Sequence, residues 1–162
     1  MTKLFPAAQG STAWSRRVAA QALAGLVAAA FVAAAGAQST GAIGKNDAQK
    51  QKLVIQVSDA EPAKWNLALN NAKNVQEELG ADKVDIEIVA YGPGLAMLKI
   101  DAATNSRVSD AVKSGIAMVA CENTMRVQKL TKDDMHPGVS YANSGVIEIM
   151  RLQRLGWSYV RP

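Results

Sequence analysis

Short apolar runs alternate with amphipathic helical patterns along most of this chain. The runs have the length and the Val and Ile content of buried strands, and Gly, Pro, Ser or Asn residues punctuate the helical patterns. The expected strands are 53–57, 84–90, 116–120, 139–142 and 157–160. The expected helices are 62–79, 95–99, 105–113, 122–130 and 145–155. This alternation predicts an α/β fold, in which helices cover both faces of a mostly parallel sheet.

Periodicity within these segments also predicts which residues are buried. In the helix 62–79, the apolar stripe at helical spacing is Trp65, Leu69, Ala72, Val75 and Leu79. In the helix 145–155, the stripe is Val146, Ile149 and Met150, with Leu152 or Gln153. The strand 84–90 alternates polar and apolar residues in its first half, which favours an edge position or a partly exposed face.

Residues 1–37 are predicted to be a secretory signal peptide. Basic residues precede an uncharged Ala-, Leu- and Val-rich stretch over 18–35, and Ala35-Gly36-Ala37 is a small-residue cleavage site. We therefore expect a periplasmic or secreted protein that begins at Gln38 and has no stable membrane anchor. An uncleaved anchor is the alternative, although the apolar run is short and weakly hydrophobic for a span. Arg16-Arg17 leaves both Sec and twin-arginine export open.

The charge of the chain comes mainly from this leader. The sequence has 18 Lys and Arg residues against 14 Asp and Glu residues. Three of the basic residues and none of the acidic ones fall within residues 1–37, so 15 and 14 remain in the rest. Without a basic block, nucleic acid is not an expected partner. Residues 38–51 are polar and Gly-rich and predict a flexible tether, and residues 52–162 are expected to form one domain.

The turns that follow the strands are expected to meet at one rim of the sheet, where ligands of open α/β sheets usually bind. This topology yields a candidate ligand-binding set from four turns. Its members are Ser58, Asp59, Tyr91, Gly92, Gly94, Glu122, Asn123, Thr124, Asn143 and Ser144. The pattern indicates where a ligand would bind but not which ligand, because every parallel α/β domain has such a rim.

Cys121 is the only cysteine, and it stands between an expected strand and an expected helix. Backbone N–H groups at the start of a helix favour the thiolate, so Cys121 is the candidate catalytic residue. The alternative is a small core residue that ends a buried strand, since free cysteine is among the most buried side chains. A lone cysteine excludes an internal disulfide, and an exported domain of this size is then expected to be stabilised by packing and by oligomerisation.

His136 is the only histidine, and the sequence predicts a solvated loop residue just before Pro137. A Cys–His pair would instead indicate a thiol hydrolase. No cluster of His, Cys and carboxylate residues predicts a metal site, and no glycine-rich phosphate-binding motif is present. We therefore expect neither a metal nor an organic cofactor.

The mature chain resembles the DsrE/DsrF-like family of small α/β sulfur-relay proteins, and within it an exported, mostly uncharacterised subgroup. The resemblance covers nearly all of residues 52–162, and the Cys121-Glu122-Asn123-Thr124-Met125 run looks specific for the subgroup. The other segments that carry it are 52–58, 65–72, 89–94, 145–146 and 156–157.

The resemblance implies a three-layer α/β/α fold with a parallel five-stranded sheet. It also implies homo- or hetero-oligomers and a cysteine that carries sulfur as a persulfide, whose position Cys121 matches. The expected function is to bind or carry a small sulfur species on Cys121, with a thiol- or sulfur-donor protein as a possible partner. The alternatives are a non-catalytic oligomeric binding domain with a structural cysteine and, third, a thiol hydrolase.

Overall fold

A parallel sheet of five strands organises the part of the chain that the computed structural model describes, residues 50–162. The strands are β1 (Gln51–Val57), β2 (Val84–Ala90), β3 (Ala117–Cys121), β4 (Ser140–Ala142) and β5 (Ser158–Val160). Their order is β4-β3-β2-β1-β5, and every pairing is parallel. The predicted α/β fold is therefore confirmed. The expected signal peptide and nearly all of the expected tether lie outside the described residues, and β1 already begins at the tether's last residue, Gln51.

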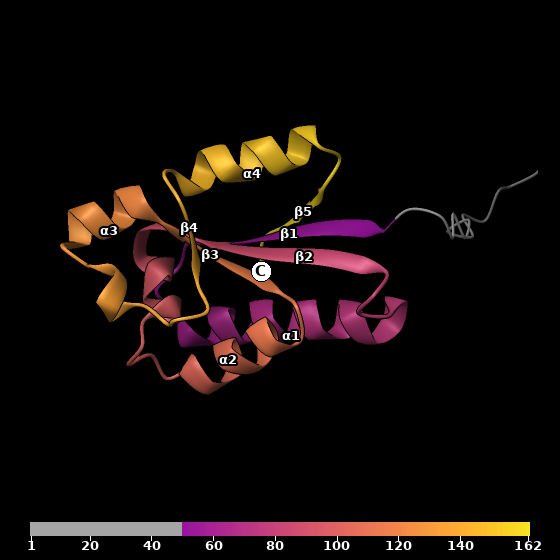
Figure 1. The fold of residues 1–162 in the computed structure, drawn as a ribbon, viewed down its shortest axis with the longest axis horizontal. Helices are drawn as coiled ribbons and strands as arrows, with labels where there is room; N and C mark the ends of the chain where they lie inside the picture. Colours follow the sequence, from indigo (N-terminus) through magenta and orange to yellow (C-terminus); the bar gives the residue numbers. More distant parts are fainter. Residues whose placement is uncertain (1–49) are drawn as a thin grey trace, which may run out of the picture. The chain divides into compact units, whose positions relative to one another are not determined.

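The crossover connections determine which face of the sheet each helix covers. The helices are α1 (Pro62–Leu79), α2 (Asn105–Lys113), α3 (Glu122–Gln128) and α4 (Gly145–Arg154), with 3-10 helices η1 (Gly92–Leu98) and η2 (Lys132–Asp134). From β1 to β4 the chain steps in one direction across the sheet, and right-handed crossovers place the connecting helices on one side. The connection from β4 to β5 runs back from one edge of the sheet to the other, and it places α4 on the opposite face. Figure 1 shows α1 and α2 below the sheet, α4 above it, and α3 beyond the ends of the strands.

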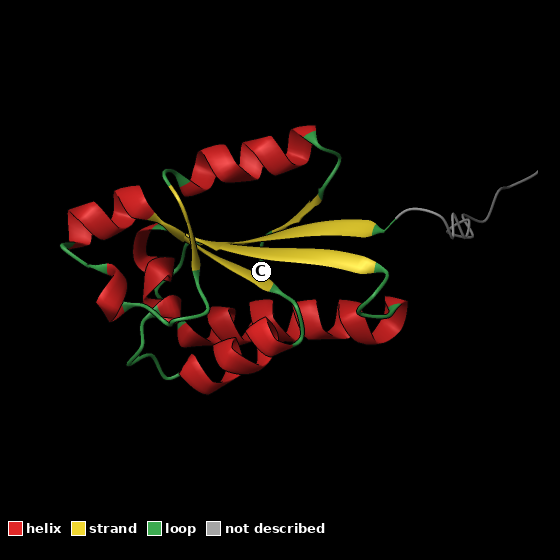
Figure 2. Ribbon diagram, in the orientation of Figure 1, coloured by secondary structure: helices red, strands yellow, loops and turns green. Residues whose placement is uncertain are grey.

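Two apolar cores of unequal size fill the layers, and Figure 2 shows the helices that enclose them. The larger core lies under α1, α2 and η1 and contains fully buried side chains such as Ile55, Ile88 and Leu95. The smaller core lies under α4 and consists of Val54, Val89, Val119, Ile149 and Leu152. The α4 face of the sheet is thus covered by one helix, whereas the opposite face is covered by several elements.

Two sequence-based expectations about burial are corrected by this arrangement, and the two alternatives for β2 are resolved. Leu79 is 42% exposed at the last turn of α1. Val146 and Met150 are 49% and 46% exposed, because only the side of α4 that carries Ile149 and Leu152 meets the sheet. β2 is the central strand, so its alternating pattern reflects a partly exposed face and not an edge. Within residues 50–162, no helix combines the length and apolar character needed to span a membrane.

Candidate functional site

Cys121 is the last residue of β3 and the N-cap of α3, as the sequence pattern predicts. Its side chain is buried, with 4% of the residue exposed, yet it belongs to neither apolar core. The register pairs it with Ala142 at the end of β4. The thiol is therefore enclosed by polar backbone at the rim of the sheet, an environment different from that of a core cysteine.

Opposing influences act on the ionisation of this thiol. Burial raises the pKa of Cys121, and hydrogen bonds to the sulfur lower it. The donors are the Thr124 hydroxyl and the backbone N–H groups of Gly145, Thr124 and Asn123. Together they outweigh burial, so the pKa of Cys121 lies below its ordinary value. The site therefore makes the thiolate, which is the nucleophilic form, easier to form than in a free cysteine.

The Thr124 hydroxyl connects the sulfur to the turn after β2. The backbone N–H of Gly92 donates a hydrogen bond to Thr124 Oγ1 over 2.9 Å, which leaves the hydroxyl proton free to point at the sulfur. The Gln128 side chain donates to the Gly92 carbonyl oxygen at 3.1 Å. Gly92 has a φ of 53°, in the left-handed region that glycine adopts readily. These contacts fix α3 against the rim and orient the hydroxyl.

The start of α4 closes the other side of the sulfur. The Asn143 carbonyl oxygen accepts a long hydrogen bond of 4.0 Å from the Cys121 thiol and one of 3.0 Å from the Asn123 backbone N–H. Gly145, which donates its N–H to the sulfur, packs on the ring of Tyr91. A Cβ atom at Gly145 would lie 3.1 Å from that ring, so the close approach depends on glycine.

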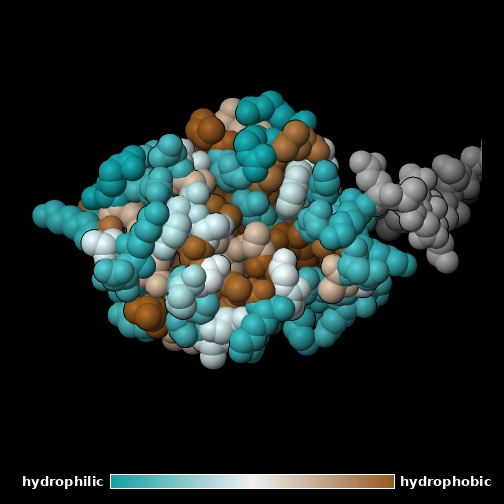
Figure 3. All heavy atoms as spheres, viewed as in Figure 1, coloured by the Kyte–Doolittle hydropathy of each residue, from teal (hydrophilic) through white to brown (hydrophobic). Residues whose placement is uncertain are grey.

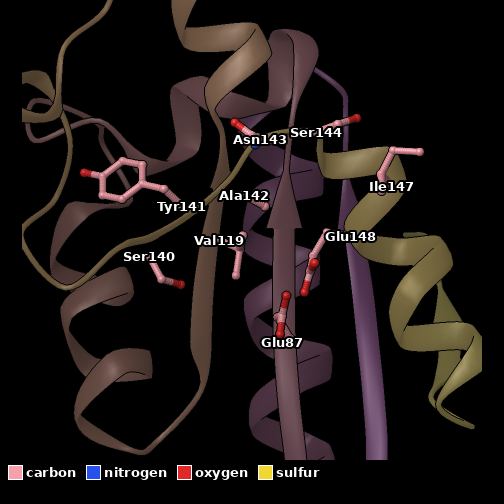
Figure 4. A pocket seen from close by; sticks show the side chains of 9 residues that line it. All are labelled: Glu87, Val119, Ser140, Tyr141, Ala142, Asn143, Ser144, Ile147 and Glu148. Atoms are coloured by element: carbon pink, nitrogen blue, oxygen red, sulfur yellow. The ribbon is translucent and has the colours of Figure 1, made fainter.

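Two hollows flank Cys121, although Cys121 lines neither of them. The first, of about 380 Å³, runs down the α4 face of the sheet, and Figure 4 shows its lining. Its lining residues are Glu87, Val119, Ser140, Tyr141, Ala142, Asn143, Ser144, Ile147 and Glu148. The second, of about 370 Å³, lies between the turn after β2 and α3. Its lining residues are Gly92, Pro93, Asn123, Thr124, Val127 and Gln128. Each hollow therefore ends at residues that contact the sulfur.

Sequence reasoning missed a carboxyl pair in the first hollow. Glu87 of β2 and Glu148 of α4 point toward one another (Figure 4), and Glu87 Oε1 is buried without a hydrogen-bond partner. Burial and the neighbouring charge of Glu148 raise the pKa of Glu87 to about 7. The Arg151 guanidinium hydrogen-bonds to Glu148 and lowers the pKa of that carboxyl. The alternation in β2 was a signal that Glu87 faces a partly exposed surface, but it did not identify the partner.

Several predicted rim residues make contacts within the protein itself. Asp59 forms ion pairs with Lys64 and Arg161, each at 3.3 Å, and Arg161 lowers the pKa of Asp59. Ser58 accepts a hydrogen bond from the Gln56 side chain. Gly94 is buried, and a Cβ there would lie 2.4 Å from the Val57 carbonyl oxygen. Because Gly94 has no side chain, the backbone of Val57 and Ser58 packs against it at the position where we expected a ligand.

The remaining predicted residues lie on the segments next to Cys121. Tyr91 and Gly92 approach from the turn after β2, and Glu122 is the first residue of α3. Asn123 and Thr124 follow in the same helix, where the Thr124 N–H supports the sulfur and the Asn123 N–H donates mainly to the Asn143 carbonyl oxygen. Asn143 and Ser144 immediately precede α4 and line the first hollow.

His136 is buried, with 7% of the residue exposed, so the expectation of a solvated loop residue is wrong. Met135 and Val139 on either side belong to the larger core and draw the loop inward. The Gly138 N–H donates to His136 Nδ1 at 3.0 Å, which places the ring proton on Nε2. Nε2 then donates to Ser109 Oγ at 2.7 Å, so both ring nitrogens have partners other than Cys121.

Within the described residues, no three His, Cys, Asp or Glu side chains are grouped as a metal ion would require. The polar groups around Cys121 are mostly donors directed at one sulfur atom. The arrangement can stabilise a thiolate, and the contacts that residues 50–162 make with the sulfur are one hydroxyl, backbone N–H groups and one carbonyl oxygen.

Solved structures identify the relatives of this chain. Protein MTH1491 from Methanobacterium thermoautotrophicum, described as being of unknown function, is 33% identical with a TM-score of 0.67. The match covers 70% of this chain and 100% of that protein. This chain belongs to the family of MTH1491. BT1422 from Bacteroides thetaiotaomicron, also of unknown function, shares the fold at 16% identity and a TM-score of 0.58, over 69% of this chain and 95% of that one. No protein-family model and no curated protein matches the chain.

Proposed function

We propose that this protein is an exported sulfur carrier in which Cys121 holds a sulfur atom as a persulfide. The observation that carries the proposal is the set of donors around the Cys121 sulfur, which lower the pKa of the thiol although the side chain is buried. The position of Cys121 in the resemblance to DsrE/DsrF-like proteins supports the same role. A structural core cysteine needs no hydrogen bonds directed at its sulfur.

The chemistry is an exchange of sulfur between thiols without net oxidation. The Cys121 thiolate attacks the outer sulfur of a donor persulfide, R–S–SH, and the R–S⁻ thiolate leaves, so that Cys121–S–SH forms. An acceptor thiolate then attacks the outer sulfur of Cys121–S–SH and regenerates the Cys121 thiolate. The Thr124 hydroxyl and the backbone N–H of Gly145 stabilise the thiolate released in the second step.

The two hollows are the proposed routes of donor and acceptor to the sulfur. One ends at Asn143 and the other at Thr124, and both residues contact Cys121. Volumes near 380 Å³ are at the small end of ligand sites, so they suit a small thiol or the tip of a loop. The side chain's 4% exposure restricts access by larger reagents and protects a stored persulfide.

We place the carrier in the periplasm or outside the cell, because the sequence of residues 1–37 has the features of a cleavable signal peptide. A homo-oligomer is part of the proposal. Apolar side chains lie exposed on α4, namely Val146, Ile147 and Met150. Figure 3 shows apolar surface over this helix among mostly hydrophilic residues. Such a patch favours contact with another protein surface, here a second copy.

Intact-mass spectrometry tests the carrier role. The native protein is incubated with glutathione persulfide, and we expect the mass of one sulfur atom to be added and then removed by a reductant. Cys121→Ser removes the only thiol and should abolish the adduct. The denatured wild-type protein is the matched control, because its thiol has no organised donors and should react more slowly at about pH 6. No adduct on the native protein, together with alkylation only after denaturation, contradicts the carrier role.

The burial of Cys121 favours a second candidate, a non-catalytic oligomeric binding domain with a structural cysteine. In that case Cys121→Ser lowers the free energy of unfolding, since a hydroxyl replaces sulfur in an enclosed site. It also leaves binding of the unknown partner unchanged. The carrier role predicts the opposite pattern, with nearly unchanged stability and complete loss of the sulfur adduct.

A further inference from the structure

The first turn of α4 is the part of the Cys121 site whose position can depend on side chains far from the sulfur. It supplies the Gly145 N–H to the Cys121 sulfur, and it follows directly on the Asn143 carbonyl, 4.0 Å from the same atom. The turn packs on the Tyr91 ring through Gly145. A small displacement of this turn therefore removes a donor from the thiolate without disturbing the donors of α3.

At the end of this first turn of α4, Glu148 meets Glu87 of the central strand. The two carboxyl groups face each other in the first hollow (Figure 4), and Glu87 Oε1 is buried without a partner. Arg151 holds Glu148 from the solvent side, with 2.9 Å between Nε and Oε2. Glu148 also belongs to the same helical turn as Gly145, because its backbone N–H bonds to the Ser144 carbonyl.

Two carboxylates in contact cannot both remain ionised without a large cost. Arg151 keeps Glu148 ionised, so the shared proton resides on Glu87, whose pKa is raised to about 7. The neighbouring strands present Val54 and Ala117 opposite Glu87, and neither can neutralise its charge. When it is protonated, Glu87 donates a hydrogen bond to Glu148. When it is ionised, the two side chains repel.

The nearest other carboxylate on this face of β2 has its own partner. Asp85, on the same side of β2, pairs with Lys50 at 2.9 Å, and its register partner on β1 is Lys52. Only Glu148 and Arg151, both on α4, act on the ionisation of Glu87 as charges. The protonation of Glu87 is thus coupled to α4 more than to any other element.

We propose that Glu87 and Glu148 are positioning residues for Cys121. Their shared proton holds the first turn of α4 against the sheet, where the Gly145 N–H stabilises the Cys121 thiolate. When that proton is lost, the turn moves away and the thiolate loses this hydrogen bond. The inference deepens the proposed function and rests on it for its biological meaning. The carrier then holds a stabilised thiolate at mildly acidic pH. Above neutral pH it has a less stabilised and more nucleophilic sulfur.

Titration of Cys121 in two uncharged variants tests this coupling. Glu87→Gln keeps a donor for Glu148 at every pH, whereas Glu87→Ala removes it. We expect the acid ionisation constant of the Cys121 thiol to be about fivefold smaller in Glu87→Ala than in Glu87→Gln, at the low end of typical coupling between sites. Neither variant has a charge at position 87, so direct electrostatics affects both equally. Glu78→Gln, on the exposed side of α1, is the matched control and should behave as wild type.

The Gly145 amide gives a second readout that needs no thiol. In a Cys121→Ser background, its NMR chemical shift should titrate with a midpoint near the pKa of about 7 that Glu87 has, and Glu87→Gln should abolish the titration. A flat Gly145 shift, or equal Cys121 ionisation in Glu87→Ala and Glu87→Gln, overturns the inference. Both measurements are independent of sulfur donors. A protein that shows the coupling but forms no persulfide therefore refutes only the sulfur-carrier role.

Discussion

The two faces of the sheet differ in how completely they are covered. Under α1, α2 and η1, the larger core is continuous and contains many fully buried side chains. Under α4, the core has five buried residues, and beside it lie a hollow, a carboxyl pair and the side of Cys121 that meets Asn143 and Gly145. The comparison indicates that one face supplies most of the stability, whereas the other retains buried and partly buried polar groups beside its smaller core.

Truncation of the larger core should give the largest effect and would sharpen this contrast. Ile88 is fully buried in the larger core, whereas Ile147 on α4 is 58% exposed. We expect Ile88→Ala to lower the free energy of unfolding by about 3–4 kcal/mol, because the cavity adds to the lost burial. The matched Ile147→Ala should change it by less than about 0.5 kcal/mol. Chemical denaturation measures both, and similar losses would break the contrast between the faces.

The carboxyl pair makes the α4 face sensitive to pH. The folded state raises the pKa of Glu87 from 4.5 to about 7, so the folded protein binds the proton more tightly than the unfolded chain does. This contribution to stability is full below pH 4.5 and is lost as the pH rises to about 7. We expect a loss on the order of 1–3 kcal/mol between these values. Glu87→Gln should remove it.

Denaturation at a series of pH values checks this prediction, with Glu78→Gln as the control. Glu148 acts in the opposite direction, because Arg151 lowers its pKa, and its contribution is lost as the pH falls through that lowered value. If the stability of the wild type and of Glu87→Gln rises in parallel from pH 4.5 to about 7, the assignment of the proton to Glu87 is wrong.

The Thr124 hydroxyl should affect reactivity more than stability. Thr124→Val removes a donor to the Cys121 sulfur, and the loss of one hydrogen bond to a charged group should reduce the thiolate fraction at about pH 6 roughly tenfold. The remaining thiolate is more nucleophilic because its pKa is higher, so alkylation by iodoacetamide should slow about threefold. The variant also leaves the Gly92 N–H without its acceptor, at a cost of about 1 kcal/mol. Thr124→Ser keeps the hydroxyl and is the matched control. Equal alkylation rates in the two variants would show that the hydroxyl does not support the thiolate.

The smallest effect on the folded monomer is expected from the exposed apolar patch on α4. Met150→Lys should change the free energy of unfolding of the monomer by less than about 0.5 kcal/mol, since Met150 is 46% exposed. If the patch joins two copies, the same variant should lower the molar mass measured by light scattering. Leu67→Lys, a comparably exposed residue on α1, is the control. An unchanged mass in Met150→Lys places the oligomer contact elsewhere.

Local sequence patterns predicted most of the fold. The limits of α1 and β2 agree with the expected segments, and the other strands differ by a residue or two. These elements follow from patterns within a few residues, such as the helical spacing from Pro62 to Leu79. The position of Cys121 between β3 and α3 was predictable for the same reason, because it depends on the type of the two adjacent segments.

The sequence by itself therefore determined the elements, the parallel architecture and the rim location of Cys121. Only the tertiary structure decided which partners reach that rim. The Asn143 carbonyl and the Gly145 N–H reach the sulfur because β4 pairs with β3 in a register that sets Ala142 beside Cys121. Glu87 meets Glu148 because α4 returns across the sheet, and His136 is buried because its neighbours enter the larger core. Hydrogen bonding and burial depend on such distant contacts, which no local pattern encodes.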